Sequence, residues 1–163
     1  MADIDFPAGL PKALASAYTS TQAAAFIESE AASGGFYVRK ITDDIYAEYN
    51  LQWALTDGQA VYLMAWFRSA TQLGTKPFNM SMLIDGEEVT KECRFTRGGI
   101  PQLTSQQGKV YIYSARVFVR DNDNSFTDNY DMLQWFAERA PDGNPFTGMA
   151  LLDQGITESA PEA

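Results

Sequence analysis

The stretch that most restricts the fold is an alternating run at residues 45–55, which leads without a break into a helical pattern. In "IYAEYNLQWAL" the residues from Ile45 to Leu55 at every second position are apolar. A period of two is typical of a strand with one face on a core. We therefore predict a half-buried strand that feeds directly into a helix.

The helix is predicted over "LTDGQAVYLMAWFRSATQLG", residues 55–74, because both of its ends carry signals. Thr56 and Gln59 have the spacing of a capping box, and Gly74 stands where a left-handed residue ends many helices. At about 100° per residue, one face collects the expected core stripe. Its members are Ala60, Leu63, Met64, Phe67, Ala70 and Thr71.

A second apolar face on this helix exceeds what packing on one side of a small domain requires. It holds Tyr62, Trp66 and Leu73 and leaves a narrow solvent strip of Val61, Ala65, Arg68 and Gln72. Two interpretations remain open: another part of the same chain covers this face, or another subunit does.

Further strands are predicted on both sides of a tight turn. Residues 78–84 and 89–96 flank Asp85-Gly86, a pair typical of hairpin turns. Residues 98–108, "GGIPQLTSQQG", have the composition of a loop, and "KVYIYSARVFVRD", residues 109–121, indicates a strand that is apolar on both faces.

The ends of the chain are less clear. Residues 12–32 suit either a helix or strands, and we favour a hairpin joined through Ser33-Gly34-Gly35. "TDNYDMLQWFAERAP" predicts a short helix with a cap at Thr127 or Asn129. Trp135 falls on the polar side of that helix.

Together these patterns predict an α+β, mainly β fold: an antiparallel β-sandwich or open barrel with one central helix packed on it and a short C-terminal helix. We expect a single domain over residues 1–152 and an acidic flexible tail at 153–163. The predicted core comprises Leu51, Trp53, Leu63, Phe67, Phe78 and Phe95.

The charge balance argues against two classes of partner. Twelve basic and 21 acidic residues give a net charge of −9, which repels phosphate backbones and anionic membranes. We therefore expect no nucleic acid and no membrane partner. No apolar run is long enough to span a bilayer, no signal peptide is apparent, and the single cysteine excludes an internal disulfide.

The sequence contains no histidine, so it lacks the commonest general base and metal ligand. It also contains no glycine-rich phosphate motif with the required spacing. We therefore expect no enzymatic activity, no catalytic residues, no metal and no cofactor.

Three weaker chemical candidates are better explained structurally. Residues 121–132 resemble a calcium loop, but Phe126 replaces the glycine that such a loop needs and Met132 replaces its glutamate. The carboxylate pairs Asp43/Asp44 and Glu87/Glu88 suit a turn and opposite strand faces. Cys93 lies in a predicted strand and is expected to be a small buried residue.

The order of strand "AEYNLQWALTDGQ", helix "AVYLMAWFRSATQLGTKPF", hairpin "NMSMLIDGEEVTKECRFT" and strand "KVYIYSARVFV" resembles a known group. It is similar to the small minor tail and distal-tail proteins of tailed bacteriophages, the group that includes the minor tail protein M of phage lambda. Matching features are Gln59, Trp66-Phe67, Gly74, Phe78 and Arg94-Phe95; the opening "DFPAGLPKAL" is similar to proteins from phage tail gene clusters. The similarity spans roughly residues 45–120, and residues 121–163 have no counterpart.

This resemblance implies a tail module that is made in the host cytoplasm, assembles into rings of copies with other virion tail proteins, and resides in the virion. In a ring, one patch meets a different patch on the next copy. The expected interface residues are Tyr62, Trp66 and Leu73 on one side and Tyr130 and Trp135 on the other.

Two other classes of protein fit the same sequence. An acidic cytoplasmic assembly chaperone or immunity-type binding protein would also be negatively charged and without catalytic residues. A carbohydrate-binding sandwich would use Trp53, Trp66 or Trp135 as a stacking platform. Trp53 lies on the apolar face of its strand and is better explained as core.

Overall fold

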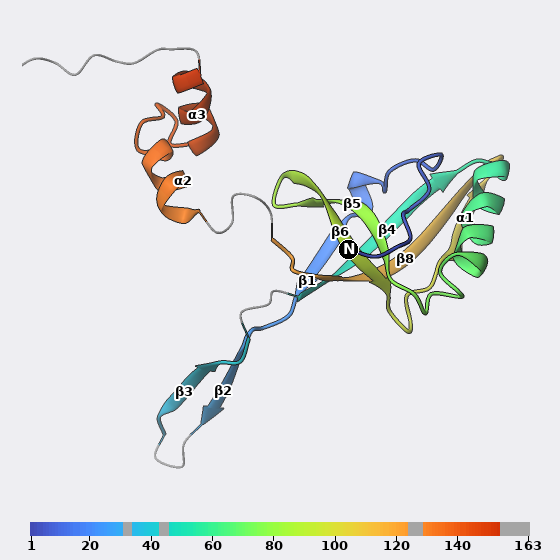
Figure 1. Cartoon of the computed structure of the whole chain (residues 1–163), viewed down its shortest axis with the longest axis horizontal. Helices are drawn as coiled ribbons and strands as arrows, with labels where there is room; N and C mark the ends of the chain where they lie inside the picture. The colour runs from blue at the N-terminus through green and yellow to red at the C-terminus, as the bar shows by residue number, and fades with distance from the viewer. Residues whose placement is uncertain (31–33, 43–45, 124–128, 154–163) are drawn as a thin grey trace, which may run out of the picture. The chain divides into compact units, whose positions relative to one another are not determined.

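The computed structural model describes residues 1–30, 34–42, 46–123 and 129–153, and its fold is α+β and mainly β, as predicted (Figure 1). The chain forms two compact units, residues 1–122 and 123–163, rather than the single domain expected over 1–152. Within the second unit, the two C-terminal helices contact each other. Most of the predicted tail, residues 154–163, lies outside the described residues.

The first unit is built on one six-stranded sheet with the order β1-β4-β8-β6-β5, in which β7 also pairs with β8. All of its strand pairs are antiparallel. The strands of this sheet are β1 (Thr19–Gln22), β4 (Tyr46–Leu55), β5 (Phe78–Ile84), β6 (Glu87–Phe95), β7 (Gln102–Gln107) and β8 (Val110–Arg120).

The long pairing of β4 with β8 forms the centre of the sheet and runs from Tyr46 opposite Arg120 to Leu55 opposite Tyr111. The other edge of β8 is shared: β6 pairs with Val117–Val119, and β7 pairs with residues 110–114. Residues 98–108 were predicted as a loop, and this was wrong for β7. Its polar sequence "QLTSQQ" shows no apolar alternation, and its conformation comes from backbone hydrogen bonds to β8.

Helix α1 (Asp57–Ser69) follows β4 after one residue and lies beside β4 and β8 (Figure 1). The Thr56 backbone N–H donates to Gln59 Oε1 at 3.1 Å, so the predicted cap is present. The helix ends four residues earlier than its pattern suggested. Thr71 Oγ1 donates to the Phe67 carbonyl at 2.6 Å, and Gln72, Leu73 and Gly74 then take left-handed conformations.

All six predicted core residues are buried. The alternating face of β4 packs under α1 with the inner face of β5, as the period of two required. The β5–β6 turn was also predicted correctly: Asp85 and Gly86 both have positive φ, 49° and 87°, which is the geometry of a type I′ hairpin turn.

The N-terminal segment connects elements that the sheet leaves apart. Near its start, Asn79 N donates to the Ile4 carbonyl and Phe6 N to the Asn79 carbonyl, which places this segment along β5. Farther on, Leu14 N donates to the Gln52 carbonyl of β4 at 2.7 Å. A short 3-10 turn (Ala15–Ala17) and β1, neither of which was predicted as such, then complete the path.

Strands β2 (Phe26–Glu30) and β3 (Phe36–Lys40) form a separate antiparallel hairpin, so the preference for a hairpin in this region was correct. Among the described elements, each of these strands contacts only the other. The hairpin therefore takes no part in the core.

The second unit holds α2 (Tyr130–Ala137), which was predicted, and α3 (Pro145–Asp153), which was not. Asn144 Oδ1 accepts from Phe146 N at 3.0 Å and caps α3, with Pro145 in the first turn. The two helices approach closely at Gly148, where an added Cβ would lie 2.2 Å from the Phe136 carbonyl oxygen. A glycine is thus required at this crossing.

We predict that the same substitution will have very different effects at two phenylalanines. Phe67 is 5% exposed and Phe36 is 69% exposed. Phe67→Ala should lower the free energy of unfolding by about 3–5 kcal/mol, whereas Phe36→Ala should lower it by less than about 0.5 kcal/mol. Urea denaturation of both variants measures this, and equal losses would contradict the assignment of core and surface.

A second prediction concerns alkaline pH. Tyr18 is partly buried, its hydroxyl accepts from Leu83 N at 3.0 Å, and burial raises its pKa from 10.0 to about 12. Because the unfolded chain ionises first, the stabilising effect of Tyr18 is complete below about pH 10 and is lost as the pH rises towards about 12. Burial also raises the pKa of Cys93, from 9.0 to about 12, which acts in the same direction. The free energy of unfolding should decline over this range, and less steeply in Tyr18→Phe; parallel curves for the two proteins would contradict the role of Tyr18.

Candidate interaction surfaces

Trp66, the central residue of the predicted helix interface, is buried by its own chain and is only 8% exposed. Its ring packs edge-on against Phe6, Phe78 and Phe95, with centroids 5.4, 5.0 and 6.2 Å away. The indole N–H donates to the Asp5 carbonyl at 3.2 Å. The N-terminal segment therefore covers this residue, which was one of the two interpretations the sequence left open.

The other members of that predicted face remain on the surface. Tyr62 is 51% exposed and Leu73 is 64% exposed. With Trp66 buried between them, they do not form a continuous apolar surface. The expectation of an interface centred on Trp66 is therefore corrected.

The predicted residues of the second unit, Tyr130 and Trp135, are both exposed. The guanidinium of Arg139 lies 3.8 Å from the centre of the Trp135 ring, a cation–π contact, and Phe136 packs against the ring at 5.0 Å. Trp135 is thus held in one orientation on the surface of α2.

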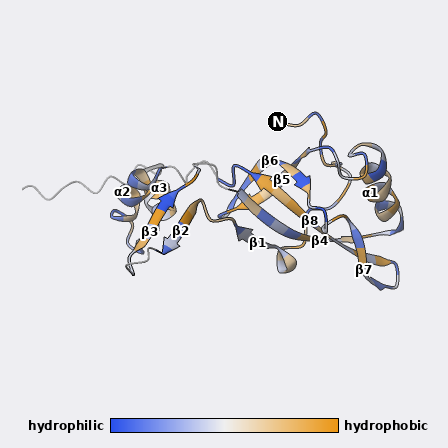
Figure 2. Cartoon of the chain, turned by 90° about the horizontal axis from the view of Figure 1, so that it is seen from below, coloured by the Kyte–Doolittle hydropathy of each residue, from blue (hydrophilic) through white to orange (hydrophobic). Residues whose placement is uncertain are grey.

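Among the described residues, the largest group of exposed apolar side chains lies on the β2–β3 hairpin, which the interface residues predicted from the sequence do not include. Its members, which are 50–69% exposed, are Phe26, Ile27, Phe36, Tyr37, Val38 and Ile41. Figure 2 shows hydrophobic stretches on the hairpin as well as in the sheet. Monomeric proteins rarely expose so many large apolar residues together, so such a surface marks an interaction site.

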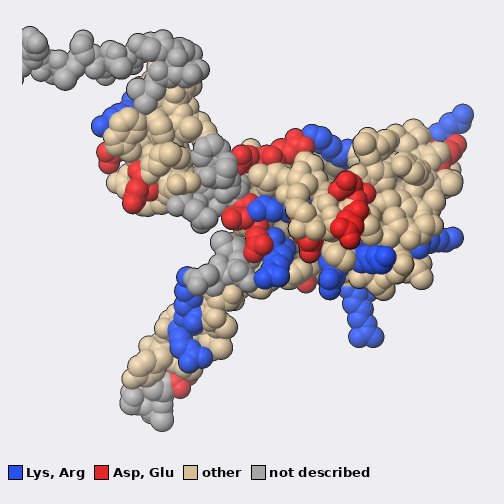
Figure 3. Space-filling model, viewed as in Figure 1, with Lys and Arg blue, Asp and Glu red and all other residues tan. Residues whose placement is uncertain are grey.

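The strand register divides the hairpin into two faces. Face one carries Phe26, Glu28, Glu30, Phe36, Val38 and Lys40, and face two carries Ala25, Ile27, Ser29, Tyr37, Arg39 and Ile41. Face one therefore has three charges and face two has one, Arg39. Figure 3 shows basic side chains along one edge of the hairpin.

A groove of about 570 Å³ runs between α1 and β8, and we call it the α1–β8 groove. Its lining residues are Asp57, Ala60, Val61, Met64, Ala65, Arg68, Tyr111 and Tyr113. Three of the four residues that the sequence assigned to solvent, Val61, Ala65 and Arg68, thus lie in one wall of a largely apolar groove. A hydrogen bond to the Asp57 carboxylate raises the pKa of Tyr111 and links the two walls at one end.

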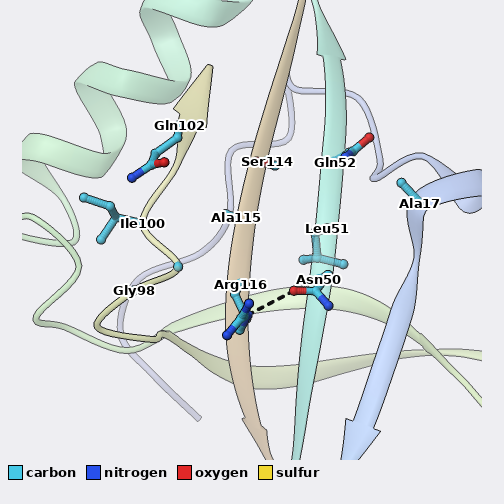
Figure 4. A pocket seen from close by; sticks show the side chains of 11 residues that line it. Ala17, Asn50, Leu51, Gln52, Gly98, Ile100, Gln102, Ser114, Ala115 and Arg116 are labelled. Carbon is cyan, nitrogen blue, oxygen red and sulfur yellow. Dashed lines mark hydrogen bonds between the residues drawn. The ribbon is translucent and has the colours of Figure 1, made fainter. Parts of the chain in front are cut away.

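A second hollow, of about 260 Å³, lies over β4 and β8 beside the loop at residues 98–102 (Figure 4). Its charged lining group, the Arg116 guanidinium, donates to Asn50 Oδ1 at 3.0 Å and lies 3.9 Å from a Glu48 carboxylate oxygen. The residues around it include no nucleophile with a neighbouring base. The hollow has no arrangement that would support acid–base or covalent catalysis.

The remaining chemical candidates do not assemble into a site either. The described residues contain no group of three or more potential metal-ligating side chains of the His, Cys, Asp and Glu types. Cys93 is buried, and Glu88 accepts from Lys12 Nζ at 2.6 Å, which lowers its pKa. Asp43, Asp44 and residues 124–128 of the calcium-like loop lie outside the described residues.

No known protein family, curated protein or solved structure matches this chain. Within the part of the chain that the structure describes, no helix is long and apolar enough to cross a membrane.

The burial of Trp66 leads to a testable contrast. Trp66→Asp should unfold the protein, because it places an unpaired charge in an aromatic core. The neighbouring change Tyr62→Asp should leave the fold intact, because Tyr62 is half exposed. Circular dichroism and thermal melting compare the two, and a folded Trp66→Asp protein would contradict the packing described above.

Proposed function

We propose that this protein is a structural component of a bacteriophage tail, at the minor tail, distal-tail or tail-tip level, which acts by ring-type assembly with its own copies and with other virion tail proteins. In this proposal it is not an enzyme and requires no cofactor. It functions in the virion after synthesis in the host cytoplasm.

The observation that carries the assembly proposal is the exposed hairpin. An isolated two-stranded hairpin is at best marginally stable in water, and this one is apolar on both faces. Aromatic side chains are enriched in protein interfaces, and the hairpin presents Phe26, Phe36 and Tyr37. A partner that covers the hairpin would remove this apolar area from water.

The resemblance to minor tail proteins supplies the biological setting of the proposal. Its strand, helix, hairpin and final strand correspond to β4, α1, β5–β6 and β8, in that order. The interface differs from the one first expected, since Trp66 belongs to the core. We therefore propose the hairpin as the interface, although it precedes the region of resemblance in the sequence.

We predict that the triple variant Phe36→Ser/Tyr37→Ser/Val38→Ser will remain folded and fail to self-associate. The three side chains lie in no described core contact, so stability should change little, while loss of interface anchors weakens association. Leu83→Ser is the matched control, because it removes exposed apolar area from β5 instead. Sedimentation at high protein concentration, with circular dichroism of each variant, measures both properties.

If the triple variant assembles as well as the wild type does, the proposed role of the hairpin is wrong. A stoichiometric complex with a basic partner and no self-association would instead support the chaperone or immunity-type alternative.

For the tail itself, antibodies against the protein should label the tails of particles of the encoding phage. Particles that contain none of the protein would refute the virion role.

A further inference from the structure

The hairpin and the α1–β8 groove have different shapes, and both are largely apolar. The hairpin is a two-sided ribbon, whereas the groove is concave and lined mainly by Val61, Met64 and Ala65 with the rings of Tyr111 and Tyr113. The surface over α1 carries few charged side chains on the face shown in Figure 3. An apolar ribbon and an apolar groove are the two unlike patches that a head-to-tail contact requires.

We propose that the β2–β3 hairpin of one copy docks, through face two, in the α1–β8 groove of the next copy. This inference rests on the proposed function and specifies the two surfaces that meet. The occupant of the groove is thus a second copy of this chain.

The charges on the two hairpin faces favour face two as the one that docks in the groove. The only charge on face two is the guanidinium of Arg39, and this side chain has no hydrogen bond or ion pair with any described residue. The groove has a carboxylate, Asp57, at one end and a guanidinium, Arg68, at the other. An ion pair between Arg39 and Asp57 is attractive and orients the ribbon, whereas face one would bring two further carboxylates, Glu28 and Glu30, into an apolar groove.

The spacing of side chains agrees with this orientation. Asp57 and Val61 are one helical step of four residues apart, a rise of about 6 Å. Arg39 and Tyr37 are neighbours on one face of a strand, a distance of about 6.6 Å. If Arg39 meets Asp57, Tyr37 can therefore lie over Val61, which is 71% exposed in the single chain.

The test uses one variant of each surface. Tyr37→Ser/Arg39→Ser removes the hairpin contact, and Val61→Arg fills the groove with a charge. Tyr62→Arg is the matched control, because Tyr62 is the next residue of α1, is also exposed and does not line the groove. Each of the two interface variants should weaken self-association at least about tenfold, while Tyr62→Arg should leave it unchanged.

Mixing the two defective variants gives the decisive result. Each mixed pair retains one intact hairpin and one intact groove, so an equimolar mixture should form a complex of two chains that cannot grow further. If the hairpin variant loses association while Val61→Arg assembles as the wild type does, the hairpin docks elsewhere; this inference then fails while the proposed function stands. If neither variant has an effect, this inference and the assembly role of the hairpin both fail, and the antibody labelling of phage particles still decides the virion role.

Disulfide cross-linking tests the same contact when association is weak. A Tyr37→Cys chain and a Val61→Cys chain, tagged to differ in mass, should form a mixed disulfide under oxidation at high concentration. The matched pair Tyr37→Cys with Tyr62→Cys should not. Absence of the mixed disulfide would overturn the inference. A chain that carries both Val61→Cys and Trp135→Cys tests the other occupant. A disulfide within that chain would also overturn the inference, because it would assign the groove to the chain's own C-terminal unit.

Discussion

The packing of the Trp66 indole organises the first unit, because this ring joins four segments that are distant in sequence. It contacts Phe6 of the N-terminal segment, Phe78 of β5 and Phe95 of β6, and it projects from α1. Its single polar atom is satisfied by the Asp5 carbonyl. Burial of so large an aromatic surface with its hydrogen bond satisfied stabilises the N-terminal segment and α1 together.

This arrangement explains why the apolar surfaces of the chain have different roles. The buried apolar residues of β4, β5, β6, β8 and α1 form one cluster, to which the N-terminal segment adds Leu10. The hairpin has no such cover within the described chain and keeps its apolar residues in water. The core is therefore complete without the hairpin, and the hairpin is available for a partner.

Charge provides a further reason to look for protein partners. A net charge of −9 keeps copies of the chain apart at long range and disfavours nucleic acid. In the assembly that we propose, association comes from short-range apolar contact, aided by local ion pairs such as the one we infer between Arg39 and Asp57. Head-to-tail contacts of this kind generate rings when the rotation between copies closes.

Short-range patterns in the sequence determined the elements whose signals lie within a few residues of each other. These are the half-buried strand β4, the capped start of α1, the Asp85-Gly86 turn and the six core residues, because alternation, capping and turn chemistry are local properties. Strand β7 was not predictable in this way, since its polar residues form a strand only because β8 offers a free edge. The end of α1 was likewise set by the Thr71 hydroxyl and the packing at Phe67.

The candidate interaction surfaces depended on the tertiary structure. The helical periodicity of residues 55–74 showed more apolar surface than packing on one side requires, but it did not show which part is covered. The hydrogen bond from the Trp66 indole to the Asp5 carbonyl joins residues that are 61 positions apart in the sequence. Because such contacts depend on how the chain returns to itself, only the folded structure decided that Trp66 is core and that the hairpin and the α1–β8 groove are exposed.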